Sequence, residues 1–242
     1  MSSQLLMVED AEGTTPQWRR QAIGELLDFL QLRGVVTLFL RLHPLLDSAE
    51  ADLARFGAIV DHGPTFDIPL DRPLEEIRGG MRMNHRRGIR SFHANGFSCE
   101  PDTEWRYLDE FYHLYSLEFF EQLRDGLGDI AELLYVGANP QYQQQVPQIG
   151  LYDRELEWAH GQGLHDYFLD EGAHESLRHF KAGITKVQPI ASSARIVVDP
   201  VEYGRLCALW EREHERVVGR TDGFFPPYLQ PAESSMDEPA RA

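Results

Sequence analysis

Two lysines stand out in this sequence, because nearly all of its cationic side chains are arginines. Lysine and arginine together number 23, and only Lys181 and Lys186 are lysines. A compact ammonium can direct three N–H donors at one developing negative charge, whereas a guanidinium is a rigid fork that suits carboxylates and phosphates. We therefore expect chemistry in the segment around Lys181, residues 176–184. The alternative is that both lysines lie on a solvated surface.

Five arginines concentrate in a segment that is predicted to form one long helix, residues 73–94. Four of them are spaced four residues apart, which places their side chains on one helical face. Arginine forms bidentate hydrogen bonds with phosphates, so this stripe is a candidate contact for substrate phosphates or an RNA backbone. The alternative is a surface network neutralised by acidic neighbours such as Glu75 and Glu76. The arginines are Arg78, Arg82, Arg86, Arg87 and Arg90.

Other patterns typical of catalysis or metal binding are missing from the sequence. The ten histidines show no His-Glu-x-x-His spacing, and His174 and His179 are five residues apart, which does not place them on one helical face. We expect nearly all histidines to be structural or surface residues, and we expect no bound metal. Ser176 lies outside a Gly-x-Ser-x-Gly elbow, and no glycine-rich phosphate loop is present.

Composition limits the compartment and the partners. A net charge of −16 repels polyanions, which argues against DNA or an anionic membrane as a non-specific partner, so a phosphate-bearing ligand requires a local basic patch. Cys99 and Cys207 have neither metal-site nor disulfide-framework spacing, which fits a reducing compartment. No signal-peptide core is present, and the longest aliphatic run, residues 35–40, is too short to cross a bilayer. We expect a cytoplasmic protein without a transmembrane segment.

Hydrophobic spacing predicts helices interleaved with short strands. Helical periodicity, proline at helix starts and glycine at helix ends predict the helices, and β-branched or aromatic runs between turn residues predict the strands. Helices are predicted at 16–33, 45–56, 73–94, 103–127, 147–161 and 199–217, with a short one around residue 180. Strands are predicted at 35–41, 58–61, 65–70, 131–137, 164–169 and 187–198. The sequence therefore predicts a mixed α+β protein of the α/β class.

Five sequence segments resemble motifs of the FemABX-type peptidyl and aminoacyl transferases, which carry paired acetyltransferase-like (GNAT) domains. They occur in the same order over about 190 residues. The segments are FLRLHPLL at 39–46, FDIPL at 66–70, NHRRGIR at 84–90, YVGANPQY at 135–142 and SLRHFKAGI at 176–184, and the last is followed by an aromatic ending, GFFPPY at 223–228. The resemblance implies a mixed sheet flanked by helices, with one complete and one partial GNAT unit.

The resemblance also implies a division of the chain. A partial first GNAT-like unit with long helices is expected at residues 16–128, and a second GNAT-like unit at residues 129–228. A flexible N-terminus is expected at residues 1–15 and a disordered tail at residues 229–242.

The activity that the resemblance implies is transfer of an acyl or aminoacyl group to an amine. The donor is aminoacyl-tRNA or acyl-CoA, used as a co-substrate with no bound cofactor, and the acceptor is an amine such as that of a peptidoglycan precursor. Amine attack on an ester or thioester forms a tetrahedral oxyanion, which a preorganised donor stabilises by roughly 3–4 kcal/mol. Lys181 is the expected donor, and Phe180 is expected to exclude water. We expect Lys181→Ala to abolish transfer with little change in melting temperature.

Further site residues follow from the same resemblance. Arg86, Arg87 and Arg90 are expected to hold phosphates of the acceptor or the carrier, and Asn139, Tyr142 and Asp67 are expected to contact substrate. Asp67 and Glu171 are both candidates for the general base, and the choice between them stays open. These residues are Asp67, Arg86, Arg87, Arg90, Asn139, Tyr142 and Glu171.

Two departures from the family pattern support a rival hypothesis. The turn that is glycine-rich in the family carries two carboxylates here, Asp170 and Glu171. The chain also passes from residue 129 directly into residues 131–135, where relatives carry an additional strand pair that helps to form the donor cleft. The rival is a catalytically degenerate FemABX/GNAT-type remnant that serves as a binding or scaffold protein. An unrelated acidic interaction module is a third alternative.

Overall fold

The computed structural model describes residues 15–46, 49–99, 104–107, 129–132, 148–172, 174–215, 217 and 223–230. These residues form two compact units. The first unit contains the described residues up to Gly63 and from Ile190 onward, and the second contains those from Pro64 to Pro189. Every predicted site residue that the structure describes belongs to the second unit. The division does not coincide with the boundary expected between residues 128 and 129.

The first unit is built on a three-stranded sheet in the order β1-β6-β2. β1 (Thr37–Leu42) runs antiparallel to β6 (Ile190–Val197), and β2 (Ala58–Pro64) pairs with the other edge of β6. Helices α1 (Pro16–Leu32), α2 (Glu50–Leu53) and α8 (Pro200–His214) and the 3-10 turn η3 (Pro227–Leu229) belong to this unit. Its core consists of Ile23, Leu40, Leu42, Leu53, Ala194, Ile196 and Val198.

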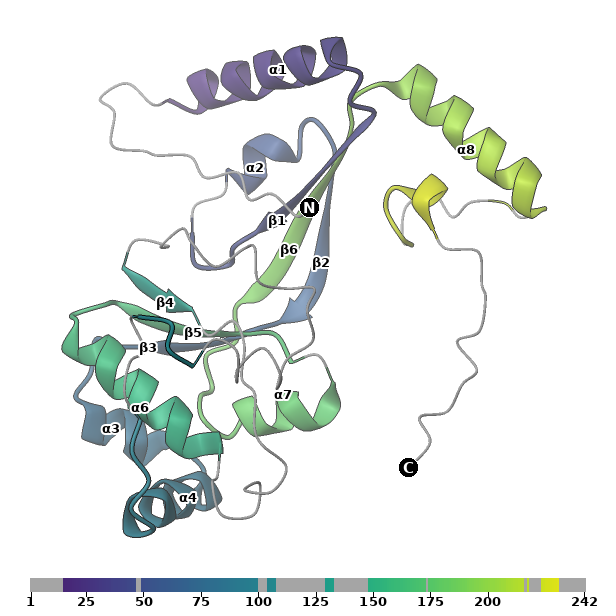
Figure 1. The fold of residues 1–242 in the computed structure, drawn as a ribbon. Helices are drawn as coiled ribbons and strands as arrows, with labels where there is room; N and C mark the ends of the chain where they lie inside the picture. The colour runs from purple at the N-terminus through teal and green to yellow at the C-terminus, as the bar shows by residue number, and fades with distance from the viewer. Residues whose placement is uncertain are drawn as a thin grey trace. The chain divides into compact units, whose positions relative to one another are not determined.

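The second unit is built on a separate three-stranded sheet in the order β3-β5-β4 (Figure 1). β3 (Phe66–Pro69) pairs antiparallel with β5 (Asp166–Asp170), and β4 (Ile130–Glu132) pairs parallel with β5. An isolated antiparallel bridge joins Asp67 to Val187 on the other side of β3. β3 therefore lies between β5 and the chain that follows α7 (Glu175–Lys181).

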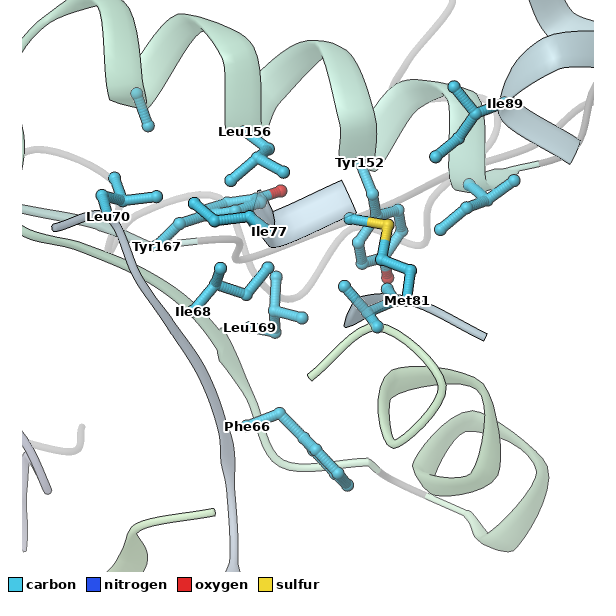
Figure 2. Close-up of a cluster of buried hydrophobic side chains, with 13 residues drawn as sticks. Phe66, Ile68, Leu70, Ile77, Met81, Ile89, Tyr152, Leu156, Tyr167 and Leu169 are labelled. Carbon is cyan, nitrogen blue, oxygen red and sulfur yellow. The ribbon is translucent and has the colours of Figure 1, made fainter. Parts of the chain in front are cut away.

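Helices cover one face of this second sheet. They are α3 (Leu74–Gly80), α4 (Met83–Ala94) and α6 (Gln148–Gly161). Side chains pointing from these helices meet side chains from β3 and β5, as Figure 2 shows for Leu156 of α6 and Ile77 of α3 around Tyr167. The cluster consists of Phe66, Ile68, Leu70, Ile77, Met81, Ile89, Ile149, Tyr152, Leu156, Ala159, Tyr167, Leu169 and Ile184. It fixes the helices that carry the candidate site residues.

The expected mixed α and β composition is confirmed, but three local predictions were wrong. The helix predicted at 73–94 is two helices, because Met81 (ψ 151°) and Arg82 (ψ 143°) are extended after Gly79 and Gly80. Glycine has a low helix propensity, and two in succession favour a break. The helix predicted at 45–56 is reduced to α2, which begins after Ala49 in the left-handed region (φ 53°).

The third wrong prediction is the end of the strand at 58–61, which continues to Pro64 as β2 (Ala58–Pro64). The strands predicted on either side of residues 62–64 belong to different sheets, since β2 pairs with β6 and β3 pairs with β5. Thr65 between them donates its backbone N–H (2.8 Å) and its hydroxyl (2.7 Å) to the Pro189 carbonyl. This buried anchor holds the chain directly before β3.

Several sequence predictions fall outside the described residues. They are the helix at 103–127 over most of its length, the strand at 131–137 beyond Glu132, the N-terminus up to residue 14 and the tail from residue 231. Across the ranges that the structure does describe, no helix combines the length and the apolar character needed to cross a membrane.

Candidate functional site

Lys181 is the last residue of α7, and its side chain is buried at 5% exposure. Its ammonium Nζ donates one hydrogen bond to the Leu169 carbonyl and another, of 2.6 Å, to the Glu171 carbonyl. Burial lowers the pKa of Lys181, and the nearby charges of Asp170 and Glu171 act in the opposite direction. The ammonium therefore fixes the chain where β5 ends and the acidic turn begins.

The two lysines have different surroundings. Lys186 is exposed and donates to the Ala182 carbonyl at 2.7 Å, so the surface alternative applies to Lys186 and not to Lys181. Two of the three ammonium donors of Lys181 are engaged by backbone carbonyls. The expectation that Lys181→Ala leaves the melting temperature nearly unchanged does not hold for this geometry, because both carbonyls would lose a buried donor.

Phe180 packs between α4 and α6. Its ring centroid lies 4.8 Å from that of His85 on α4 and 5.3 Å from that of Tyr152 on α6. Gly183, two residues after Lys181, makes the approach of His85 possible. A Cβ at Gly183 would lie 2.4 Å from Cε1 of His85, closer than van der Waals contact allows. Phe180 is thus docked directly on α4, which bears Arg86, Arg87 and Arg90.

His85 is a functional candidate that the sequence analysis did not single out. It is 7% exposed, and neither ring nitrogen has a hydrogen-bond partner. Burial lowers the pKa of His85 most, and the charge of Arg82 lowers it further. The Phe180 backbone carbonyl raises the pKa, although it does not reach hydrogen-bond geometry with the ring. The sequence signal was its position four residues before Ile89, on the buried stripe of α4.

Asp67 is buried at 1% exposure on the face of the sheet opposite the helices, since Phe66 and Ile68 on either side of it both join the hydrophobic cluster. Burial raises its pKa to about 7, and the carboxyl of Asp166 adds to this effect by its charge and by a side-chain hydrogen bond. The Asp67 carbonyl accepts a hydrogen bond of 2.6 Å from the Thr185 hydroxyl. Asp67 is therefore connected to the 180–185 segment through its backbone.

The arginines do not form one stripe, because the helix breaks between Gly80 and Met83. Arg78 makes a bidentate ion pair with Asp153 (2.7 and 3.0 Å). Glu75, one of the acidic neighbours expected to neutralise the stripe, lies 3.6 Å from the Arg78 guanidinium. Arg82 donates to the ring Nε2 of His179 at 2.6 Å, which adds a second contact between α4 and α7.

The remaining three arginines point away from the core on α4. Arg86, Arg87 and Arg90 are exposed, and none has an ion pair with another residue in the described ranges. They remain candidates for phosphate contact. Asn139 and Tyr142 lie outside the described residues. Glu171 is exposed and follows the end of β5. In the described part of the chain, no group of three or more histidine, cysteine, aspartate or glutamate side chains is arranged to hold a metal ion.

Comparisons of the chain with protein-family models, with curated proteins and with solved structures found no match.

Proposed function

We propose that this protein is an N-acyltransferase of the FemABX/GNAT type. It moves an acyl or aminoacyl group from acyl-CoA or aminoacyl-tRNA to an amine acceptor, such as the amine of a peptidoglycan precursor, in the cytoplasm. The proposal rests on the five motifs of the sequence and on the contacts of the 180–185 segment. It includes a GNAT-like architecture for the chain.

The observation that carries the proposal is that the 180–185 segment contains one perturbed ionisable group, Lys181, packs against a second, His85, and contacts the backbone of a third, Asp67. Lys181 belongs to this segment, His85 packs on its Phe180 and Gly183, and the Asp67 backbone is bonded to its Thr185. The pKa of Lys181 and that of His85 are lowered, and that of Asp67 is raised. Buried groups with shifted pKa values are concentrated at functional sites more than elsewhere.

Lys181 suits the role of oxyanion donor in one respect. With two N–H groups held by the carbonyls of Leu169 and Glu171, the third has a fixed direction. A donor that needs no reorganisation during the reaction stabilises a developing oxyanion more than a freely rotating one does. Phe180, packed between His85 and Tyr152, would keep water from the acyl carbon. Arg86, Arg87 and Arg90 would bind the phosphates of the carrier.

The test is a transfer assay with purified protein. Labelled acetyl-CoA and labelled aminoacyl-tRNA are supplied in turn with an amine acceptor, and labelled amide is measured by mass spectrometry. The expected result is amide formation with one donor class, reduced at least about 100-fold in Lys181→Gln, which keeps two N–H donors and loses the charge. If the wild-type protein forms no amide with either donor, the proposal is wrong.

A second candidate is a catalytically degenerate protein of the same fold that binds a ligand without chemistry. The engagement of the Lys181 ammonium by two backbone carbonyls favours it, because the ammonium then has a complete structural role. This candidate predicts binding of tRNA or CoA without turnover. Arg90→Glu on α4 should weaken binding and reduce its salt dependence, whereas Arg55→Glu, an equally exposed arginine of the first unit, should not.

A further inference from the structure

Cationic side chains gather on the surface where α4 meets α7. Arg82 directly precedes α4, Arg86 follows one turn later, and His179 lies in the last turn of α7. Arg86 and His179 are exposed, and Arg82 is half-buried. Within the described ranges, no carboxylate lies within ion-pair distance of any of the three. In a chain of net charge −16, this cluster is a local basic patch that has no counter-charge from its own surroundings.

Two hydrogen bonds hold Arg82 against the end of α7. Its backbone N–H donates to the Gly183 carbonyl at 2.7 Å, and its guanidinium Nη1 donates to Nε2 of His179 at 2.6 Å. Because a guanidinium can only donate, Nε2 is the accepting nitrogen and the imidazole carries its proton on Nδ1. That Nδ1–H and the other side-chain N–H groups of Arg82 have no acceptor among the residues that the structure describes. They are donors held in fixed positions.

The electrostatic surroundings of the cluster are positive as well. After burial, the charge of Arg82 is the largest cause that lowers the pKa of His85, which lies between Arg82 and Arg86 in the sequence. The opposing contribution comes from the Phe180 backbone, and no carboxylate in the described part of the chain contributes. The positive charge of Arg82 is therefore not cancelled locally.

We propose that Arg82, Arg86 and His179 bind phosphate oxygens of a ligand. Side chains four residues apart on a helix are neighbours, so one phosphate group can accept from both guanidinia, each of which suits it through bidentate bonds. The Nδ1–H of His179 supplies a further donor from α7. This inference deepens the proposed function and rests on it in one respect, which is that the phosphate belongs to the acyl carrier. It adds Arg82 and His179 to the arginines already assigned to the carrier.

The test is calorimetric titration of the full chain with inorganic pyrophosphate. The wild type should bind with a Kd of about 1 mM or tighter. Arg82→Gln and His179→Ala should each raise the Kd at least about 5-fold, because each removes a hydrogen bond to a charged ligand. Arg178→Gln is the matched control, since it removes an exposed charge about 100° around α7 from His179. It should change the Kd less than about 3-fold, because exposed charges are screened by salt.

Arg86→Gln keeps the test valid if the other variants loosen α4 from α7. Arg86 is exposed and has no ion pair in the described ranges, so this variant should keep the wild-type melting temperature and still raise the Kd at least about 5-fold. If the wild type does not bind pyrophosphate, or if Arg86→Gln binds it as the wild type does, the inference is wrong.

Competition identifies the source of the phosphate. CoA and uncharged tRNA are added in turn to the pyrophosphate complex, and the carrier that displaces pyrophosphate should itself bind more weakly to Arg82→Gln. If neither displaces it, the phosphate does not belong to the carrier and the inference is wrong. Pyrophosphate binding that depends on these side chains, without amide formation from any donor, refutes the proposed function alone. Amide formation that is unchanged in Arg82→Gln and Arg86→Gln refutes this inference alone.

Discussion

Replacing Lys181 by methionine tests whether the buried ammonium holds the end of β5. Methionine has a similar length and flexibility but donates no hydrogen bond. The change therefore removes the bond to Leu169 and the 2.6 Å bond to Glu171 without opening a large cavity. It leaves two backbone carbonyls without this donor at a site where the lysine is only 5% exposed.

The expected loss of stability follows from these two bonds. Hydrogen bonds to charged groups contribute about 1.5–3 kcal/mol each, and removing a desolvated charge returns part of that sum. We expect Lys181→Met to lower the free energy of unfolding by about 2–4 kcal/mol. In a chain of this size each kcal/mol corresponds to about 2–4 °C of melting temperature, so a shift of about 5–15 °C is expected.

Lys186→Met is the matched control. Lys186 is the only other lysine, it is exposed, and it makes one hydrogen bond to the Ala182 carbonyl. Its replacement should change the free energy of unfolding by no more than about 0.5 kcal/mol. Urea denaturation followed by circular dichroism measures both variants. If Lys181→Met is as stable as Lys186→Met, the ammonium does not hold the two carbonyls and the reasoning is refuted.

Three further predictions concern the second unit. The folded state keeps a proton on Asp67 up to about pH 7, whereas the unfolded chain releases it near the ordinary pKa of 3.8. The free energy of unfolding should therefore fall by about 4 kcal/mol as pH rises through this window. Asp67→Asn should flatten this pH dependence in urea unfolding at pH 5 and 8, and an unchanged slope would contradict the raised pKa. Arg78→Met leaves the Asp153 carboxylate, which is 1% exposed, without its bidentate partner and should lower the free energy of unfolding by about 3 kcal/mol. Adding Asp153→Leu to Arg78→Met should recover most of this loss. A double variant that is no more stable than the single one would show that the ion pair is not the cause. Gly150→Ala places a Cβ 2.3 Å from ring carbons of Phe92 and should lower the free energy of unfolding by about 1–3 kcal/mol. Adding Phe92→Leu should restore part of the lost stability. A melting temperature equal to that of the wild type would mean that α4 and α6 do not meet at this glycine.

Local signals in the sequence predicted the starts of α1 and α8, because the interactions that begin these helices join residues close together along the chain. Asp199 accepts hydrogen bonds from the backbone N–H of Val201 and of Glu202, both at 3.0 Å, and Pro200 begins α8 as its fixed φ favours. Thr15 caps α1 in the same way, with Pro16 at the first helical position. These helix starts need no information from distant residues, so helical periodicity and a proline at the first position were sufficient to find them.

Pairing between distant segments could not be predicted in this way. β1 pairs with β6 and β3 pairs with β5, and the partners in each pair are about 100 or more residues apart along the chain. The segment at 58–70 therefore looked like two successive strands, although each belongs to a different sheet. The burial of His85 is equally non-local, because it depends on Phe180 and Gly183 arriving from another element.

The choice of lysine at position 181 has a physical explanation in the contacts of its nitrogen. The Leu169 and Glu171 carbonyls converge on one atom, and an ammonium can direct separate N–H bonds from a single nitrogen toward both. A guanidinium spreads its donors over three nitrogens in a plane and is bulkier, so it fits this 5% exposed site poorly. The same requirement would hold whether or not the protein is an enzyme. Catalysis adds one condition, which is that the third N–H of Lys181 reaches the acyl oxygen. Lys181→Gln loses the charge but keeps two N–H donors. This variant therefore separates the catalytic condition from the requirement that the two carbonyls be bonded.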